Sequence, residues 1–252
     1  MRSARRPEAT MRFADPVPDA RHVVYARIQA DPLVTRAAEL LDGATPTELR
    51  LARAVMNGVR TDPAIWRSMF PTLVGAAAPE ATRLRAEAIL DVSLRIADRG
   101  EQARQQYRGA VVEALTERLL HRRSDRVHRE RRVLFDGLPA EIHPYDVTVE
   151  DPRRPEIYDC KWGARGIDED VLHQLDDARR HAAEEGIEVL VALVVFDAER
   201  SCRARLASLR APVSGTRLVT LDGLGQLAAG PPILPADEFA PGHGPDDAVA
   251  RS

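Results

Sequence analysis

The chain has 252 residues, of which 44% are hydrophobic and 30% charged, and its formal net charge is −3. This length is enough for one large domain or two small ones with a packed core. The slightly acidic balance excludes a protein that is basic throughout, so any phosphate binding needs a local group of cations. The sequence has no run of 18 apolar residues, and no apolar segment follows the first arginines as in a signal peptide. We therefore expect a cytoplasmic protein that makes no membrane contact.

The first part of the chain has a helical pattern. Residues 1–18 are rich in Arg, Pro and Asp without periodicity, which predicts a flexible end. Between residues 19 and 101, apolar side chains recur every three or four positions, as in an all-α region. Thr45-Pro46-Thr47-Glu48 has the form of a capping box with proline at the first helical position. Asp62-Pro63 and Ala78-Pro79 mark two further helix starts.

The pattern changes after one more helix, predicted over residues 102–123. Residues 131–135, 142–149 and 156–162 are short, rich in β-branched and aromatic residues, and separated by turn sequences, as antiparallel strands are. Asp168 begins a predicted helix to about residue 185, and the apolar run 187–196 is typical of a strand buried on both faces. A strand at 217–221 and a short helix follow. This order predicts a mixed α/β domain over residues 102–230, with a flexible Pro/Gly-rich tail at 231–252.

Cations are concentrated between residues 118 and 132, where seven arginines stand against two acids, Asp125 and Glu130. Such a run is often only the solvated end of a helix. It is also what contact with a phosphate backbone requires. The second interpretation predicts nucleic-acid contacts from Arg122, Arg123, Arg126 and Arg129.

Lys161 is the only lysine among the 36 basic residues of the chain. A lone ammonium among arginines suggests a site that needs a compact point charge and cannot use a planar guanidinium. Chance survival of one lysine in an arginine-rich chain explains the same observation. The two cysteines, Cys160 and Cys202, have neither CxxC spacing nor histidines clustered around them, so they predict neither a zinc site nor a disulfide framework.

The neighbours of Lys161 decide between these interpretations. Asp159 stands two residues earlier in a predicted strand, so the two side chains project from the same face while Cys160 points to the packed side. Asp146 lies in the preceding predicted strand. Carboxylates on adjacent strands can share a hard cation. A nearby ammonium can orient the attacking water and offset developing negative charge, as phosphodiester hydrolysis requires.

These residues resemble the motif of the PD-(D/E)xK (restriction-endonuclease-like) nuclease superfamily, which includes restriction enzymes, Holliday-junction resolvases and RecB-like repair nucleases. Glu113 is similar to the first-helix glutamate of the family, Asp146 to its strand aspartate, and Asp159 and Lys161 to its acid-x-lysine pair. The resemblance covers about residues 104–200. It implies a restriction-endonuclease-like mixed sheet flanked by helices and catalysis by these four residues. It also implies Mg²⁺, or Mn²⁺ in its place, held by the three acids and the backbone carbonyl of Cys160.

The chain departs from the family pattern at three points. Tyr145 stands where the family has proline, with Pro144 one position early. Gln174 resembles the supporting glutamine of RecB-like members, but no tyrosine follows it at their spacing. Glu117, one helical turn after Glu113, competes with it for the role of the helical acid.

Three hypotheses follow. The first is a metal-dependent nuclease acting on DNA, whose region 19–101 supplies substrate contacts or a homodimer interface. The second is a non-catalytic nucleic-acid-binding or partner-binding module on the same fold. The third is a helical regulatory protein in which the α/β part is structural only. This last hypothesis requires the four side chains to lie more than about 10 Å apart, too far to share a cation.

Overall fold

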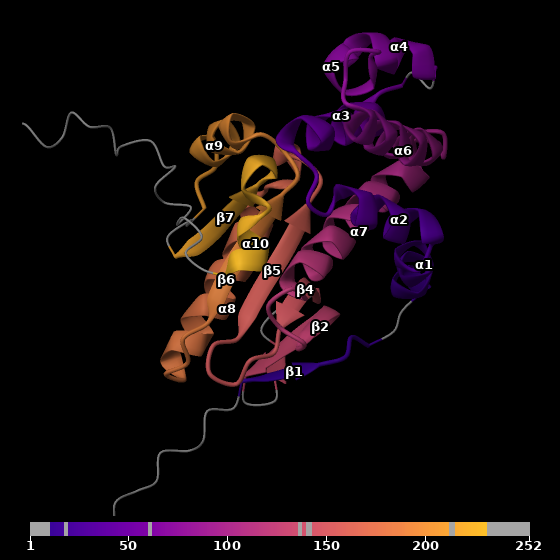
Figure 1. The fold of residues 1–252 in the computed structure, drawn as a ribbon. Helices are drawn as coiled ribbons and strands as arrows, with labels where there is room; N and C mark the ends of the chain where they lie inside the picture. Colours follow the sequence, from indigo (N-terminus) through magenta and orange to yellow (C-terminus); the bar gives the residue numbers. More distant parts are fainter. Residues whose placement is uncertain are drawn as a thin grey trace, which may run out of the picture.

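The computed structural model describes residues 11–17, 20–59, 62–135, 138–139, 143–211 and 215–230. Figure 1 shows how they are arranged. The predicted tail at 231–252 and the first ten residues of the predicted flexible end lie outside the described residues. Over the part of the chain that is described, no helix is long and apolar enough to cross a membrane.

Helices account for most of the described residues before position 100, as predicted. Thr45 accepts a hydrogen bond from the backbone N–H of Glu48 at 3.3 Å, and the Glu48 carboxylate accepts one from the Thr45 N–H at 2.7 Å, so the capping box forms. Asp62 caps the helix that begins at Pro63. The predicted start at Ala78-Pro79 is shifted by one residue, because Pro79 itself is the N-cap. The helices are α1 (Ala20–Gln29), α2 (Pro32–Leu41), α3 (Pro46–Asn57), α4 (Pro63–Met69), α5 (Pro71–Val74) and α6 (Glu80–Ala97).

A long helix, α7 (Glu101–Leu120), leads into a mixed β-sheet with strand order β1-β2-β4-β5-β6-β7. β1, β2, β4 and β5 pair antiparallel, whereas β5, β6 and β7 pair parallel. Helices α8 (Glu169–Glu184) and α9 (Glu199–Ala207) make the crossovers that parallel neighbours require. The strands are β1 (Arg12–Ala14), β2 (Val127–Phe135), β3 (Leu138–Pro139, paired with β2), β4 (Tyr145–Val149), β5 (Glu156–Lys161), β6 (Leu190–Val195) and β7 (Thr216–Thr220).

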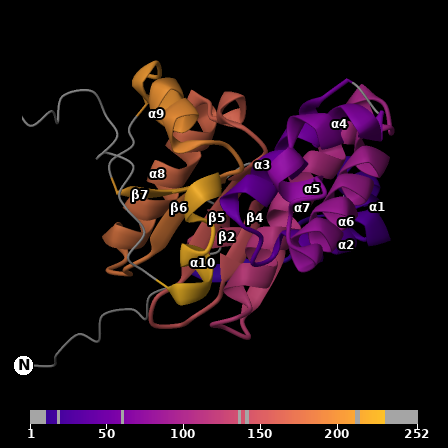
Figure 2. The ribbon, with the colours of Figure 1, turned by 45° about the horizontal axis from the view of Figure 1, so that its top comes forward.

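The sheet is covered on both faces. In Figures 1 and 2, α7 and the N-terminal helices lie on one face and α8 on the other. Buried side chains of the N-terminal helices, such as Leu90, join those of α7 and of β5, such as Leu115 and Tyr158, in one continuous core. A second core under α8 and α9 includes Leu172 and Cys202. The predicted mixed α/β fold with flanking helices is therefore confirmed, and the helical region shares its core with the sheet.

Several predicted boundaries were wrong. Strand β1 lies within the predicted flexible end and pairs with β2. Helix α7 ends at Leu120, and β2 begins at Val127, so part of the arginine-rich stretch is strand. Helix α9 was not predicted, because only two of its side chains, Cys202 and Leu206, are buried and its apolar stripe is correspondingly narrow. Three short helical segments complete the fold: η1 (Ala164–Gly166), η2 (Leu221–Gly223) and α10 (Gln226–Ala229).

Candidate metal centre

The predicted acids meet at one edge of the sheet, where β5 ends and the antiparallel β4 begins. Asp146 is the second residue of β4, and its Oδ2 accepts a hydrogen bond from the backbone N–H of Cys160 at 2.6 Å. Asp159 and Lys161 form an ion pair on the face of β5 turned away from Cys160. The Cys160 thiol faces α7, with its Sγ 3.5 Å from Thr116 Oγ1. The predicted facing of these three consecutive residues is therefore confirmed.

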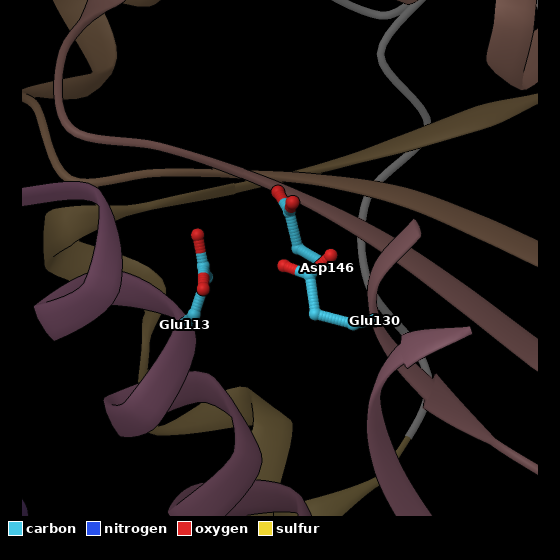
Figure 3. A group of neighbouring side chains, drawn as sticks. All are labelled: Glu113, Glu130 and Asp146. Atoms are coloured by element: carbon cyan, nitrogen blue, oxygen red, sulfur yellow. The ribbon is translucent and has the colours of Figure 1, made fainter. Parts of the chain in front are cut away.

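Three carboxylates form the centre of this edge. Glu113 from α7, Glu130 from β2 and Asp146 from β4 offer oxygens that all lie within 4.8 Å of one another. Figure 3 shows the side chains extending toward one another from the helix on one side and the strands on the other. Oxygens bound to one hard cation at 2.0 to 2.6 Å are at most about 5 Å apart. The group therefore fits a divalent cation such as Mg²⁺ or Mn²⁺.

Glu130 was not predicted as part of the site. Its backbone conformation is unusual for a residue other than glycine. Its φ of 54° is left-handed, a conformation that costs a non-glycine residue about 1 kcal/mol or more. Arg129 pairs with Val147 and Arg131 with Tyr145, so Glu130 stands opposite Asp146 between two paired positions. Strained residues of this kind cluster at functional sites. The distortion of β2 supports a role for Glu130 at the centre.

Asp159 was predicted as a direct metal ligand, but it is not one of the three clustered carboxylates; its Oδ1 is paired with Lys161 Nζ. It still acts on the centre, because its charge contributes to the raised pKa of Asp146. The predicted carbonyl ligand of Cys160 lies on the same side of β5 as the N–H that reaches Asp146, since both backbone groups of a strand residue face one neighbour.

Burial of several acids together sets the electrostatics of the centre. Burial raises the pKa of Glu113 to about 7, against hydrogen bonds from Tyr25 and Gln29 that lower it. Burial, then Asp159 and Glu113, raise the pKa of Asp146 well above its usual range. Burial also raises the pKa of Glu130. Burial is thus the main cause of the raised pKa values of all three clustered carboxylates, and a cation bound between them would favour their charged forms.

The surroundings of Lys161 favour its charged form, whereas burial favours the neutral forms of the acids. Burial alone would lower its pKa, but Asp159 and then Asp146 raise it above its usual value. The side chain is 24% exposed. The ammonium therefore stays charged at neutral pH, within reach of both the acids and solvent.

Helix α1 covers the centre on the side opposite the strands. The Tyr25 hydroxyl donates to Glu113 Oε1, and Gln29 Nε2 donates to Glu113 Oε2 at 2.7 Å and to Glu130 Oε1 at 3.0 Å. Gly109 permits this approach, because a Cβ there would lie 3.0 Å from the Tyr25 hydroxyl oxygen. Neither Tyr25 nor Gln29 was predicted, since they lie far from the motif in sequence. The helical N-terminal region therefore orients two of the three clustered carboxylates.

We expect Tyr25→Phe to weaken Mn²⁺ binding about tenfold, because groups that orient ligand carboxylates typically contribute 10- to 100-fold to metal affinity. Titration calorimetry on the full chain measures this effect. Tyr107→Phe is the matched control, since the Tyr107 hydroxyl donates to Asp31, away from the centre. Equal Mn²⁺ affinities of the two variants and wild type would remove Tyr25 from the centre.

Glu117, the other candidate for the helical acid, is not one of the three clustered carboxylates. Its carboxylate pairs with Arg129 at 3.0 Å. Glu113 is therefore the helical acid of the centre. Gln174, predicted as a supporting residue, donates from Nε2 to the His143 carbonyl at 3.2 Å. It steadies the chain entering β4, and no hydrogen bond to the clustered carboxylates is seen among the described residues.

The four arginines predicted to contact nucleic acid have different roles. Arg123 is held inside the fold by Glu156 and by the Leu227 carbonyl, so the prediction for this residue needs correction. Arg122 pairs with Asp42, and Arg129 pairs with Glu117 next to the centre. Arg126 is exposed and has no ion-pair partner within the described part of the chain. Most arginines of the arginine-rich stretch thus have a carboxylate partner.

Comparison with known proteins adds little. No family model matches the sequence, and no curated protein does. Among solved structures, one match is described as "Crystal structure of protein VC1899 from Vibrio cholerae". It has 18% sequence identity to this chain and a TM-score of 0.38, and the match covers 87% of this chain and 57% of that chain. The chain thus spans little more than half the length of that protein. We draw neither a family nor a function from a likeness at this level.

Proposed function

We propose that the protein is a metal-dependent nuclease of the PD-(D/E)xK type, with a restriction-endonuclease-like fold, which hydrolyses phosphodiester bonds in DNA. The observation that carries the proposal is the meeting of Glu113, Glu130 and Asp146 with the Asp159–Lys161 pair at one sheet edge. Such a group of carboxylates repels a phosphodiester unless a cation lies between them. With the cation it becomes a site for phosphate chemistry.

The residues divide the work. Glu113, Glu130 and Asp146 would hold the cation, which polarises the scissile phosphate and acidifies a bound water. Lys161, kept charged by Asp159, is placed to orient the attacking water and to offset negative charge that develops on the phosphate oxygens. Tyr25 and Gln29 fix the ligand carboxylates.

Water and substrate can reach the centre from solvent beside Glu130. A cavity of about 330 Å³ lies there between the end of α1 and β2, and Gln29, Arg129 and Glu130 line it. Arg129, which is paired with Glu117, forms part of the wall of this opening. The third hypothesis, which required the acids to be scattered, receives no support from this geometry.

The test is nuclease activity of the purified wild type on linear, circular and single-stranded DNA and on RNA, with Mg²⁺, with Mn²⁺ and with EDTA. Lys161→Ala, purified in parallel, reveals contaminating nucleases. The proposal predicts cleavage of DNA that needs the metal and is lost in the variant. Salt-sensitive DNA binding without cleavage by the wild type would favour the non-catalytic binding module instead.

A further inference from the structure

A second, larger cleft opens at the same sheet edge as the carboxylates. It has a volume of about 1010 Å³ and lies between α3 and the start of α7 on one side and the η1 segment and α9 on the other. Its floor is the chain that leaves the parallel strands β5 and β6, including Trp162 and Asp197. Ligands of open α/β sheets bind at such carboxyl ends of strands.

The cleft lies next to Lys161, at the end of the strand that carries it. Gly166 lines the cleft, and a Cβ at this position would lie 3.3 Å from the Cβ of Lys161, so the two residues are in contact. β4, which carries Asp146, is separated from β6 by β5 alone, a distance of about 10 Å at the usual strand spacing. A chain of phosphates lying along the sheet edge would therefore pass from the carboxylates into the cleft.

The walls of the cleft are positively charged. Arg53, Arg108, Arg165 and Arg205 line it, against the two acids Glu101 and Asp197. Arg53 pairs with Asp197 at 2.5 Å and Arg108 with Glu101 at 3.2 Å. Among the described residues, the other two arginines of the cleft have no carboxylate partner. The cleft favours an anion.

Arg165 and Arg205 are the arginines best placed to accept one. Arg165 is exposed and has no ion-pair partner in the described ranges. Among the described residues, Arg205 is hydrogen-bonded only through its Nε, which donates to the Ile167 carbonyl at 2.8 Å. Both therefore have guanidinium N–H groups that can donate to phosphate oxygens.

Trp162 adds an aromatic surface to the cleft. Its ring stacks on Phe196, with centroids 4.8 Å apart and planes at 27°, and its Nε1 donates to Asn57 at 2.7 Å. These contacts fix the ring in place on the cleft floor. Aromatic rings combined with a cationic groove are typical of single-strand binding, because unpaired bases can stack on them. The bases of an intact duplex have no free face to offer.

We propose that this cleft binds a single-stranded DNA segment next to the bond that is cleaved, with Arg165 and Arg205 on its phosphates and Trp162 against a base. The inference rests on the proposed nuclease function and specifies its substrate as DNA that is single-stranded on one side of the scissile phosphate. The bound single-stranded segment is part of the same DNA strand that is cleaved.

Binding can be measured without catalysis. The full chain is titrated in EDTA against a fluorescein-labelled 12-nucleotide thymidine oligomer, a duplex of the same length and a uridine oligomer, by fluorescence anisotropy at several salt concentrations. The test variant is Arg165→Gln/Arg205→Gln. The matched control is Arg154→Gln/Arg203→Gln, in which Arg203 lies on α9 but does not line the cleft and both residues are exposed. Thermal unfolding of both variants verifies folding.

We expect the wild type to prefer the thymidine oligomer over the duplex and over the uridine oligomer. The test variant should bind the thymidine oligomer about tenfold more weakly. The slope of log K against log salt concentration should also become shallower by about 0.7 for each lost phosphate contact. Quenching of tryptophan fluorescence by the oligomer should come from Trp162, since Trp66, the other tryptophan, is buried in α4.

The outcomes separate the two proposals. Unchanged binding by the test variant, or equal weakening in the control, would overturn the cleft assignment even if the protein cleaves DNA. Preference for the duplex or for the uridine oligomer would overturn the single-stranded DNA assignment. Specific loss in the test variant supports the cleft, and it does so even if the wild type proves to cleave nothing, in which case only the nuclease proposal fails.

Discussion

Replacing Lys161 by methionine should lower metal-dependent DNA cleavage by about 10² to 10³-fold, the usual cost of removing one group that stabilises charge in a transition state. Methionine keeps an unbranched apolar stem against Gly166 and removes only the ammonium. Single-turnover cleavage rates at saturating Mg²⁺ measure the effect. Lys161→Arg should also be impaired, because a planar guanidinium cannot replace a compact ammonium next to Asp159.

A structural role for Lys161 has to be separated from a catalytic one. Removing the ammonium leaves the Asp159 carboxylate buried without its partner, which itself lowers the free energy of unfolding. The double variant Asp159→Asn/Lys161→Met removes both charges and should recover stability without recovering activity. Recovery of cleavage in the double variant would show that Lys161 serves only to neutralise Asp159.

The predicted residues that the structure brings together share one property: local spacing fixes their relationship. Asp159 and Lys161 lie on the same face because they are two residues apart in a strand. Asp146 reaches them because β4 and β5 are consecutive antiparallel strands. Glu113 comes from the helix directly before the sheet. Each needs only the order and type of elements, which hydrophobic patterning supplies.

The position of Glu130 in the site could not be predicted from local sequence patterns. It stands among arginines, in a segment without a clear strand pattern, and it joins the site through the register of β2 on β4 and through its own left-handed backbone. Register depends on long-range pairing that no local pattern gives. Tyr25 and Gln29 were missed for the same reason, since α1 reaches the centre only through the packing of α1 on α7.

The arginines show how tertiary ion pairs change the meaning of a local charge run. A dense run of cations suggested a phosphate-binding surface, but their partners lie in distant elements: Asp42 for Arg122, Glu156 for Arg123, Glu117 for Arg129. Pairing of this kind is tertiary and invisible in local charge patterning. The cationic cleft at the strand ends was missed because its arginines come singly from α3, α7, the η1 segment and α9.

Glu113 gives the second large effect, on stability as a function of pH. Its pKa is about 7 in the folded protein, against an ordinary value of 4.5 for a glutamate exposed to water, as in the unfolded chain. Between these two pH values the folded state therefore binds more protons than the unfolded state. Stability is then unaffected below about pH 4.5, falls as the pH rises through this window, and levels off above pH 7. The shift corresponds to roughly 3 kcal/mol at most, from 1.36 kcal/mol per pH unit.

We therefore expect the metal-free wild type to unfold at a lower temperature at pH 8 than at pH 5, and Glu113→Gln to reduce this difference. The raised pKa values of Asp146 and Glu130 should retain part of it. Calorimetric unfolding in EDTA measures both. Saturating Mg²⁺ at pH 8 should stabilise the wild type, because the cation replaces the protons that the buried carboxylates would otherwise take up. The same Mg²⁺ should stabilise Glu113→Gln much less. A wild type whose stability is flat from pH 5 to pH 8 and indifferent to Mg²⁺ would contradict a buried cation site, whatever the protein does to DNA.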